Sequence, residues 1–299
     1  MFIINHRRIF FLISGLLVLA SAIAYGTYGL KLGTDFTGGT IIETEYVGVP
    51  RPEPNQLQTK IETLNLGQFS LQSIGEQSIL LRLRTVTESE HELLKTALGG
   101  KEKRYSSIGP AIGDELAKKG IVAIMIVVIL IILYIAFVFR KVSGGVSHGG
   151  VNSWKYGLIA ILALIHDISI PIGVMTLLGY YYGVEVDALF LTALLTILGL
   201  SVNDTIVVFD RIRENLKQHS GERFEEVVGR SLNETIVRSI NTSLTVALAL
   251  LVVYFFGGET TKYFALIMAI GMIVGTYSSI FIASPLLVTW QKFSARKNG

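Results

Sequence analysis

Long apolar stretches alternate with short clusters of charged residues along this chain of 299 residues. A helix needs about 20 mostly apolar residues to cross the ~30 Å hydrocarbon core of a bilayer. Six stretches meet that requirement, at residues 9–28, 119–139, 155–179, 187–209, 239–257 and 263–290. The pattern therefore predicts a polytopic α-helical membrane protein with six transmembrane helices.

The first stretch also has features of a secretory signal peptide, because Ala20-Ser21-Ala22 resembles a cleavage site. The apolar run continues past Ala22, however, and this favours an uncleaved membrane anchor. We therefore expect residues 1–28 to form the N-terminus and the first transmembrane helix.

The positions of Lys and Arg predict how the chain is oriented, because short cytoplasmic loops are enriched in these residues. If the N-terminus is cytoplasmic, the two short outside loops are residues 180–186 and 258–262, and Lys262 is the only Lys or Arg in them. The inside segments then contain Arg7, Arg8, Arg140, Lys141, Lys155, Arg211, Arg213, Lys217, Arg223, Arg230, Arg238, Lys292, Arg296 and Lys297. Both termini are expected to be cytoplasmic, which places residues 29–118 on the opposite side.

Residues 29–118 have the alternating pattern of a small folded domain with the order βαββαβ. The strands are expected at 40–47, 69–74, 78–84 and 103–108, and the helices at 54–64 and 87–99. Thr87 and Glu90 have the spacing of a helix-capping box, and Gly99-Gly100 ends that helix. The order predicts an exterior ferredoxin-like α+β domain. Residues 119–299 then supply the remaining five transmembrane helices.

The composition excludes several classes of function. The chain has no cysteine, so it has no disulfide, thiolate metal site or cysteine nucleophile, and its five histidines show no metal-ligand spacing. Nucleotide-binding and hydrolase motifs are absent. A net charge of +3 is too small to indicate a nucleic-acid partner. We expect no enzymatic activity, no catalytic residue, no cofactor and no metal.

Charged groups inside the predicted transmembrane helices are the candidates for function, because each costs ~2.5–3.5 kcal/mol at the centre of a membrane helix. His166 and Asp167 lie near the middle of the third, and Asp204 lies roughly 8 Å inside the cytoplasmic surface in the fourth. Arg238 opens the fifth, which runs antiparallel to the fourth, so Asp204 and Arg238 could meet. The alternative is a fixed ion pair that only holds the helices together. His166 could likewise satisfy Asp167 locally.

For the other polar or small residues in the transmembrane helices, a structural role is favoured over a functional one. Asn203 and Thr242 are supporting candidates, but such residues more often join helices by hydrogen bonds. Gly271 and Gly275 form a GxxxG pattern that is typical of a packing contact. Residues 210–238 are expected to form a cytoplasmic amphipathic linker, in which a short charged helix is followed by an interfacial helix from residue 222.

Several blocks of this sequence resemble the SecF family, the smaller subunits of the bacterial SecD–SecF translocase accessory complexes. They are residues 33–39 (with Asp35, Gly38 and Gly39), residues 108–116, His166-Asp167, residues 201–215 and residues 238–243. The block that contains Asn203-Asp204 is the most specific. Leu200 departs from the pattern, since Tyr is common there, but no proton chemistry requires that hydroxyl.

The resemblance implies membership of the resistance-nodulation-division superfamily, whose members use proton flow through membrane carboxylates. It implies a SecD-like partner subunit, the SecYEG channel and exported unfolded polypeptides as partners in the lipid bilayer of the bacterial inner (plasma) membrane. It also assigns a proton-relay role to the positions of Asp204 and Arg238.

Two other functions remain possible from the sequence alone. The chain could be a structural membrane partner without its own proton relay, which completes a twelve-helix bundle. It could also be a small-molecule/proton exporter of the same superfamily, although six transmembrane helices are half of the usual twelve.

Overall fold

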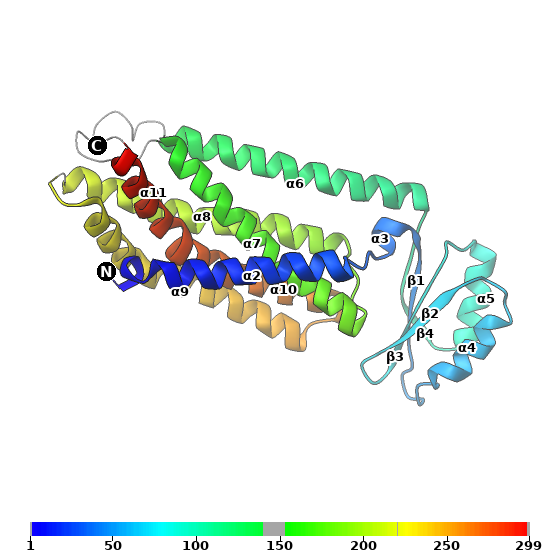
Figure 1. Ribbon diagram of the computed structural model, residues 1–299. Coiled ribbons are helices and arrows are strands. Elements are labelled where there is room, and N and C mark those ends of the chain that lie inside the picture. Colours follow the sequence, from blue (N-terminus) through cyan, green and yellow to red (C-terminus); the bar gives the residue numbers. More distant parts are fainter. Residues whose placement is uncertain (1, 140–152, 220, 298–299) are drawn as a thin grey trace. The chain divides into compact units, whose positions relative to one another are not determined.

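The computed structural model describes residues 2–139, 153–219 and 221–297. The chain divides into two compact units (Figure 1). The helical unit comprises residues 1–31, 123–184 and 189–299, and the α+β unit comprises residues 32–122 together with 185–188. The short segment 185–188, between two helices of the helical unit, therefore belongs to the α+β unit.

In the described residues, six long apolar helical segments have the length and composition to cross a membrane, which confirms the predicted number. The chain begins with a short helix α1 (Phe2–Asn5). The first five segments are α2 (Arg7–Tyr28), α6 (Pro110–Phe139), α7 (Ser153–Tyr182), α8 (Ala188–Gln218) and α9 (Phe224–Phe256). The sixth consists of α10 (Glu259–Ser278), which continues through a π-helical turn (Ser279–Ala283) into α11 (Ser284–Lys297).

The glycine pair of the sixth segment packs against α8. A Cβ atom added at Gly271 would overlap the side chain of Ile197, and one at Gly275 would lie 3.0 Å from the Cβ of Ser201. Because Ile197 and Ser201 are one turn apart, the two glycines let α10 approach a continuous face of α8. The GxxxG pattern is therefore a packing contact, as predicted.

The prediction for residues 210–238 is wrong in one respect. No separate interfacial helix forms in the described part of this segment, because α8 continues to Gln218 and α9 begins at Phe224. The apolar residues Val227, Val228 and Leu232 are buried in the same core as Phe209 and Ile212 of α8. The apolar face of this part of α9 therefore packs against α8 rather than against the bilayer surface. Two side chains of this hairpin, Asn215 and Ser231, are joined by a buried hydrogen bond of 3.0 Å.

The α+β unit contains a four-stranded antiparallel sheet in the order β2-β3-β1-β4. Its elements are α3 (Thr34–Thr37), β1 (Gly39–Glu45), α4 (Pro54–Glu62), β2 (Phe69–Ile74), β3 (Ser78–Leu83), α5 (Glu88–Leu98) and β4 (Lys101–Ile108). After the single turn α3, the order is βαββαβ. The structure confirms the ferredoxin-like fold class, with strand boundaries within two residues of those expected.

Helices α4 and α5 cover the sheet through their apolar faces (Figure 1). Ile61 of α4 and Leu94 of α5 are fully buried against Ile42 and Leu81 of the two central strands. At the start of α5, Thr87 and Glu90 form the predicted capping box, and Gly99 ends the helix in the left-handed conformation. A hydrogen bond from Arg84 and one from the backbone of Thr87 lower the pKa of Glu90 from 4.5 to about 2.

Replacing Glu90 with Gln should remove a pH-dependent part of the stability of α5. Because the folded-state pKa lies below the unfolded value, ionised Glu90 stabilises the fold above about pH 4.5, and this contribution is lost as the pH falls toward 2. Hydrogen exchange of the α5 amides should be measured at several pH values. As the pH falls, the protection of these amides should decline less in Glu90→Gln than in the unaltered chain. Glu76→Gln, at an exposed turn, is the control, and equal declines in both variants would contradict the expectation.

Candidate functional site

Asp204 lies in α8 and is partly buried between α9 and α10. The hydroxyl of Thr276 donates a hydrogen bond of 2.7 Å to its carboxylate oxygen Oδ2, and the hydroxyl of Ser243 lies 3.4 Å from the same oxygen. Ser243 and Thr276 are also hydrogen-bonded to each other. Ser243 can in addition donate to the carbonyl oxygen of Ser239, 2.9 Å away. The carboxylate of Asp204 and the hydroxyls of Thr276 and Ser243 therefore form a continuous series of hydrogen bonds.

The close approach of α10 to α8 places Thr276 beside Asp204. Thr276 follows Gly275, whose missing side chain permits the contact with Ser201, three residues before Asp204. Sequence reasoning did not select Ser243 or Thr276 as site residues. A hydroxyl within an otherwise apolar helix was the available signal, but it does not reveal which carboxylate it meets.

Arg238 is not in direct contact with Asp204. Among the residues that the structure describes, no ion pair within 4 Å joins them, although Arg238 is near enough to act on Asp204 electrostatically. The side chain of Arg238 is exposed, as are those of Asn203 and Thr242. The Thr242 hydroxyl donates to the carbonyl oxygen of Arg238 in its own helix, at 2.9 Å. The structure thus brings Asp204 together with the hydroxyls of Ser243 and Thr276 rather than with the side chains of Arg238, Asn203 and Thr242.

Asp167 in α7 has a different environment, since it is completely buried. Its Oδ1 lies 2.9 Å from Nδ1 of His166, and its Oδ2 accepts a hydrogen bond of 2.8 Å from Ser278 and another from Ser201. His166 does satisfy Asp167 locally, as one alternative foresaw. The two serines, from α10 and α8, complete a polar cluster that joins three helices.

The π-helical turn follows immediately after Ser278. Its first residue, Ser279, forms a buried hydrogen bond of 2.8 Å with Thr205 of α8. The hydroxyl of Ser284 donates to the carbonyl oxygen of Ser279 at 3.0 Å, which gives that carbonyl a partner at the end of the turn. Single π turns inside α-helices are frequent at functional sites. Here the turn adjoins hydroxyls that face both carboxylate clusters.

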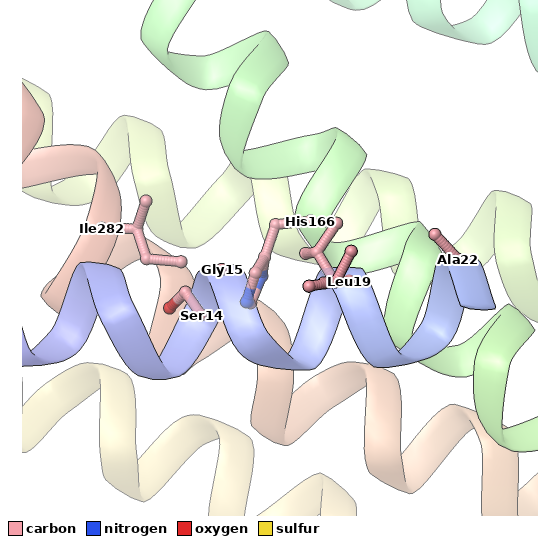
Figure 2. A pocket seen from close by; sticks show the side chains of 7 residues that line it. Ser14, Gly15, Leu19, Ala22, His166 and Ile282 are labelled. Atoms are coloured by element: carbon pink, nitrogen blue, oxygen red, sulfur yellow. The ribbon is translucent and has the colours of Figure 1, made fainter. Parts of the chain in front are cut away.

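A pocket of about 410 Å³ lies on the α2 side of His166 (Figure 2). It is lined by Ser14, Gly15, Val18, Leu19, Ala22, His166 and Ile282. Within the part of the chain that the structure describes, the buried Nε2 atom of His166 has no hydrogen-bond partner, whereas Nδ1 pairs with Asp167. The polar edge of this imidazole therefore adjoins an otherwise apolar groove.

The motif residues Asp35, Gly38 and Gly39 have a structural role in the α+β unit. Oδ2 of Asp35 accepts a hydrogen bond of 2.9 Å from the backbone N–H of Ala188, the first residue of α8. Gly38 has a φ of 75° and Gly39 a φ of 134°, in the region that favours glycine. A Cβ at Gly38 would lie 2.6 Å from the Cα of Pro110. The motif thus packs the start of β1 against the start of α6.

Comparison with known proteins agrees with this arrangement. The model for the C-terminal part of the SecD/SecF protein export membrane proteins matches residues 89–293, and the SecD/SecF GG motif matches residues 26–47. The protein translocase subunit SecF of Thermobaculum terrenum is 42% identical, over 97% of this chain and 93% of its own length. This chain belongs to the SecF family. The SecF subunit of Anaerolinea thermophila is 36% identical, over 97% of this chain and 94% of its own.

Solved SecDF structures extend the SecF-family likeness to the fold. The crystal structure of SecDF from Thermus thermophilus, described as a translocon-associated membrane protein, matches with a TM-score of 0.81 at 33% identity over 97% of this chain. A super-membrane-facing form of SecDF matches with a TM-score of 0.69, also at 33% identity. The present chain spans only 38% and 39% of those two chains. It is thus a multi-pass SecF-type subunit of the Sec translocase.

Replacing Ser278 with Ala should destabilise the helical unit by about 1–3 kcal/mol, because the completely buried Asp167 would lose a hydrogen-bond donor that water cannot replace. The measurement is the apparent unfolding temperature of the purified chain in detergent. Ser169→Ala is the matched control, because this half-buried serine of α7 donates only to a carbonyl of its own helix. A loss of the same size in both variants would contradict the expectation.

Proposed function

We propose that this chain, together with a SecD-like partner, uses the proton gradient across the bacterial inner membrane to assist export of unfolded polypeptides through SecYEG. Asp204 is the group that takes up and releases the proton, and Arg238 influences its charge state. His166, Asp167, Asn203 and Thr242 support the bundle around it.

The main support is that the partners of Asp204 suit both of its protonation states. When the carboxylate is ionised, Ser243 donates to Thr276, and Thr276 donates to Asp204. When Asp204 is protonated, the chain can reverse, so that Asp204 donates to Thr276, Thr276 to Ser243, and Ser243 to the carbonyl oxygen of Ser239. Hydroxyl groups permit this because each both donates and accepts. A guanidinium in direct contact could only donate.

The separation of Arg238 from Asp204 fits a group that titrates during a cycle. A guanidinium that approaches a carboxylate favours its ionised form, and one that withdraws favours proton uptake. A modest shift between α8 and α9 would change this distance. A proton that moves down the membrane potential supplies about 2.3 kcal/mol per 100 mV, which is comparable to the free energy between conformers of a bistable protein.

The need for a partner follows from the polar residues at the surface of α8 and α9. Arg238, Asn203 and Thr242 are exposed in the single chain, together with Asn241 and Thr245. Exposure of this polar face to lipid is costly, so we propose that the SecD-like subunit covers it. The matching SecDF chains are more than twice as long as this one, which is consistent with the two parts forming one assembly.

Replacing Asp204 with Asn tests the relay. The amide keeps the shape of the carboxylate and can still hydrogen-bond to Thr276, but it does not titrate in the relevant range. The variant should therefore assemble with the SecD-like subunit and lose most proton-dependent stimulation of export in reconstituted vesicles. The control is Asp210→Asn, an exposed aspartate of the same helix, which should retain that stimulation.

Unchanged proton-dependent export in Asp204→Asn would show that Asp204 is structural. The chain would then be a membrane partner that completes the bundle. Loss of assembly in this variant, but not in Asp210→Asn, would likewise assign Asp204 to the interface between subunits rather than to a relay.

The proposed orientation has its own test, because the chain contains no cysteine. Single cysteines at Gln72 in β2 and Gln218 at the end of α8, both exposed, should react with a membrane-impermeant maleimide from opposite sides of the membrane. Gln218 should be accessible from the cytoplasmic side. Labelling of both from one side would refute the arrangement with both termini cytoplasmic.

A further inference from the structure

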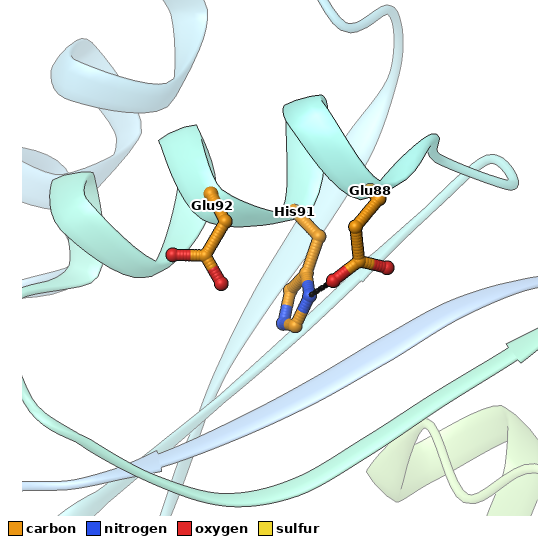
Figure 3. Close-up of side chains that lie close together, drawn as sticks. All are labelled: Glu88, His91 and Glu92. Carbon is orange, nitrogen blue, oxygen red and sulfur yellow. Dashed lines mark ion pairs between the residues drawn. The ribbon is translucent and has the colours of Figure 1, made fainter.

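Three side chains with metal-binding groups come together on the first turn of α5. His91 and Glu92 follow Glu88 by three and four residues, so both lie next to Glu88 on the helix surface (Figure 3). Each offers one ligand atom, and these atoms all lie within 4.8 Å of one another. The carboxylates are solvent-accessible, with 83% of the Glu88 side chain and 60% of the Glu92 side chain exposed.

His91, in contrast, is buried and held in a fixed orientation. Only 6% of the residue is exposed, and its ring stacks on Tyr105 with centroids 3.8 Å apart. Its Nε2 lies 2.6 Å from a carboxylate oxygen of Glu102 in β4. Because a carboxylate can only accept, Nε2 must carry the proton and donate it. A carboxylate that orients a histidine in this way is the usual outer partner of a metal-binding imidazole.

The other ring nitrogen, Nδ1, has no hydrogen-bond partner among the described residues. Nδ1 of His91 is buried, and a carboxylate oxygen of Glu88 lies 3.7 Å from it. With the proton on Nε2, Nδ1 of a neutral ring presents a lone pair toward acceptors only. Nδ1 and the two carboxylates therefore offer three metal-binding groups in one place.

We propose that Glu88, His91 and Glu92 bind a divalent transition-metal ion such as Zn²⁺, with Nδ1 and two carboxylate oxygens as ligands. One imidazole nitrogen and two carboxylates form a ligand set that zinc accepts, and water would complete the coordination. Zinc ligands lie about 2.0–2.2 Å from the metal, so the ligand atoms must move slightly closer together. The exposed glutamate side chains can do so, while His91 stays fixed.

The competing explanation is a second proton on Nδ1, which would make His91 an imidazolium ion paired with Glu88 and Glu102. The charged groups that face the ring are acidic, namely Glu88 and Glu92 of α5 and Glu102 of β4, and Lys95 lies 3.4 Å from Glu92. Both explanations place a positive charge at Nδ1, so only a binding measurement separates them.

This proposal differs from the expectation that the chain holds no metal. The five histidines are scattered and show no metal-ligand spacing with one another. The spacing Glu88-x-x-His91-Glu92 was the available signal. The decisive partner, Glu102, lies on another element, and only the fold brings it to His91.

The test uses the full-length chain without an affinity tag, purified in detergent, and titrated with Zn²⁺ by calorimetry and with Co²⁺ by visible absorption. One ion should bind per chain, with a Co²⁺ spectrum that Zn²⁺ abolishes. Glu88→Gln and Glu92→Gln should each weaken Zn²⁺ binding tenfold or more. Glu102→Gln should weaken it about ten- to a hundredfold through the orientation of His91. Glu76→Gln, which removes the same charge elsewhere, should bind as the unaltered chain does.

The nitrogen chemical shifts of His91 give a second measurement that needs no variant. Zn²⁺ should shift the Nδ1 resonance in the ¹⁵N-labelled chain and leave the proton on Nε2. The proposal is overturned if the unaltered chain shows no saturable binding, or if Glu88→Gln/Glu92→Gln binds as tightly as Glu76→Gln. A doubly protonated ring that is insensitive to Zn²⁺ would also overturn it. None of these outcomes depends on the relay at Asp204.

Discussion

The free-energy cost of placing carboxylates among apolar helices constrains the whole helical unit. Each charge near the centre of a membrane helix costs ~2.5–3.5 kcal/mol unless the protein provides compensating partners. Asp167 and Asp204 both receive hydrogen bonds from hydroxyl groups of neighbouring helices. Such partners require helices that approach closely, which explains the small residues Gly271 and Gly275 where α10 crosses α8. The helix packing is thus determined as much by two acids as by apolar contacts.

The two acids meet this constraint in different ways. The hydrogen bonds of Asp167 come from His166, Ser201 and Ser278, all within the same chain, and no part of it is exposed. Asp204 is only partly buried and has one good donor, in a hydroxyl chain that can reverse. A group with complete internal compensation is suited to holding helices together. A group with incomplete compensation can respond to a partner subunit or to water.

The apolar pattern was sufficient to predict the six transmembrane helices and the βαββαβ domain, because helix and strand periodicities are properties of the local sequence. The capping box at Thr87 and Glu90 was predictable for the same reason. The partners of the carboxylates were not. The roles of Thr276 and Ser278 depend on how α10 rotates against its neighbours, and the π-helical turn that follows has no pattern of its own in the apolar sequence. The prediction of an interfacial helix from residue 222 was wrong for a similar reason, since the apolar face of this segment packs on α8.

The two carboxylates depend on one common element. Thr276 serves Asp204 and Ser278 serves Asp167, and both hydroxyls lie within three residues of α10, directly before the π-helical turn. A rotation of this helix that withdraws one donor necessarily moves the other. In the proposed relay, proton binding at Asp204 and hydrogen bonding at Asp167 are therefore thermodynamically linked, and the linkage is reciprocal. In that proposal Asp167, although buried away from Asp204, would contribute to the proton affinity of Asp204 through the shared helix α10.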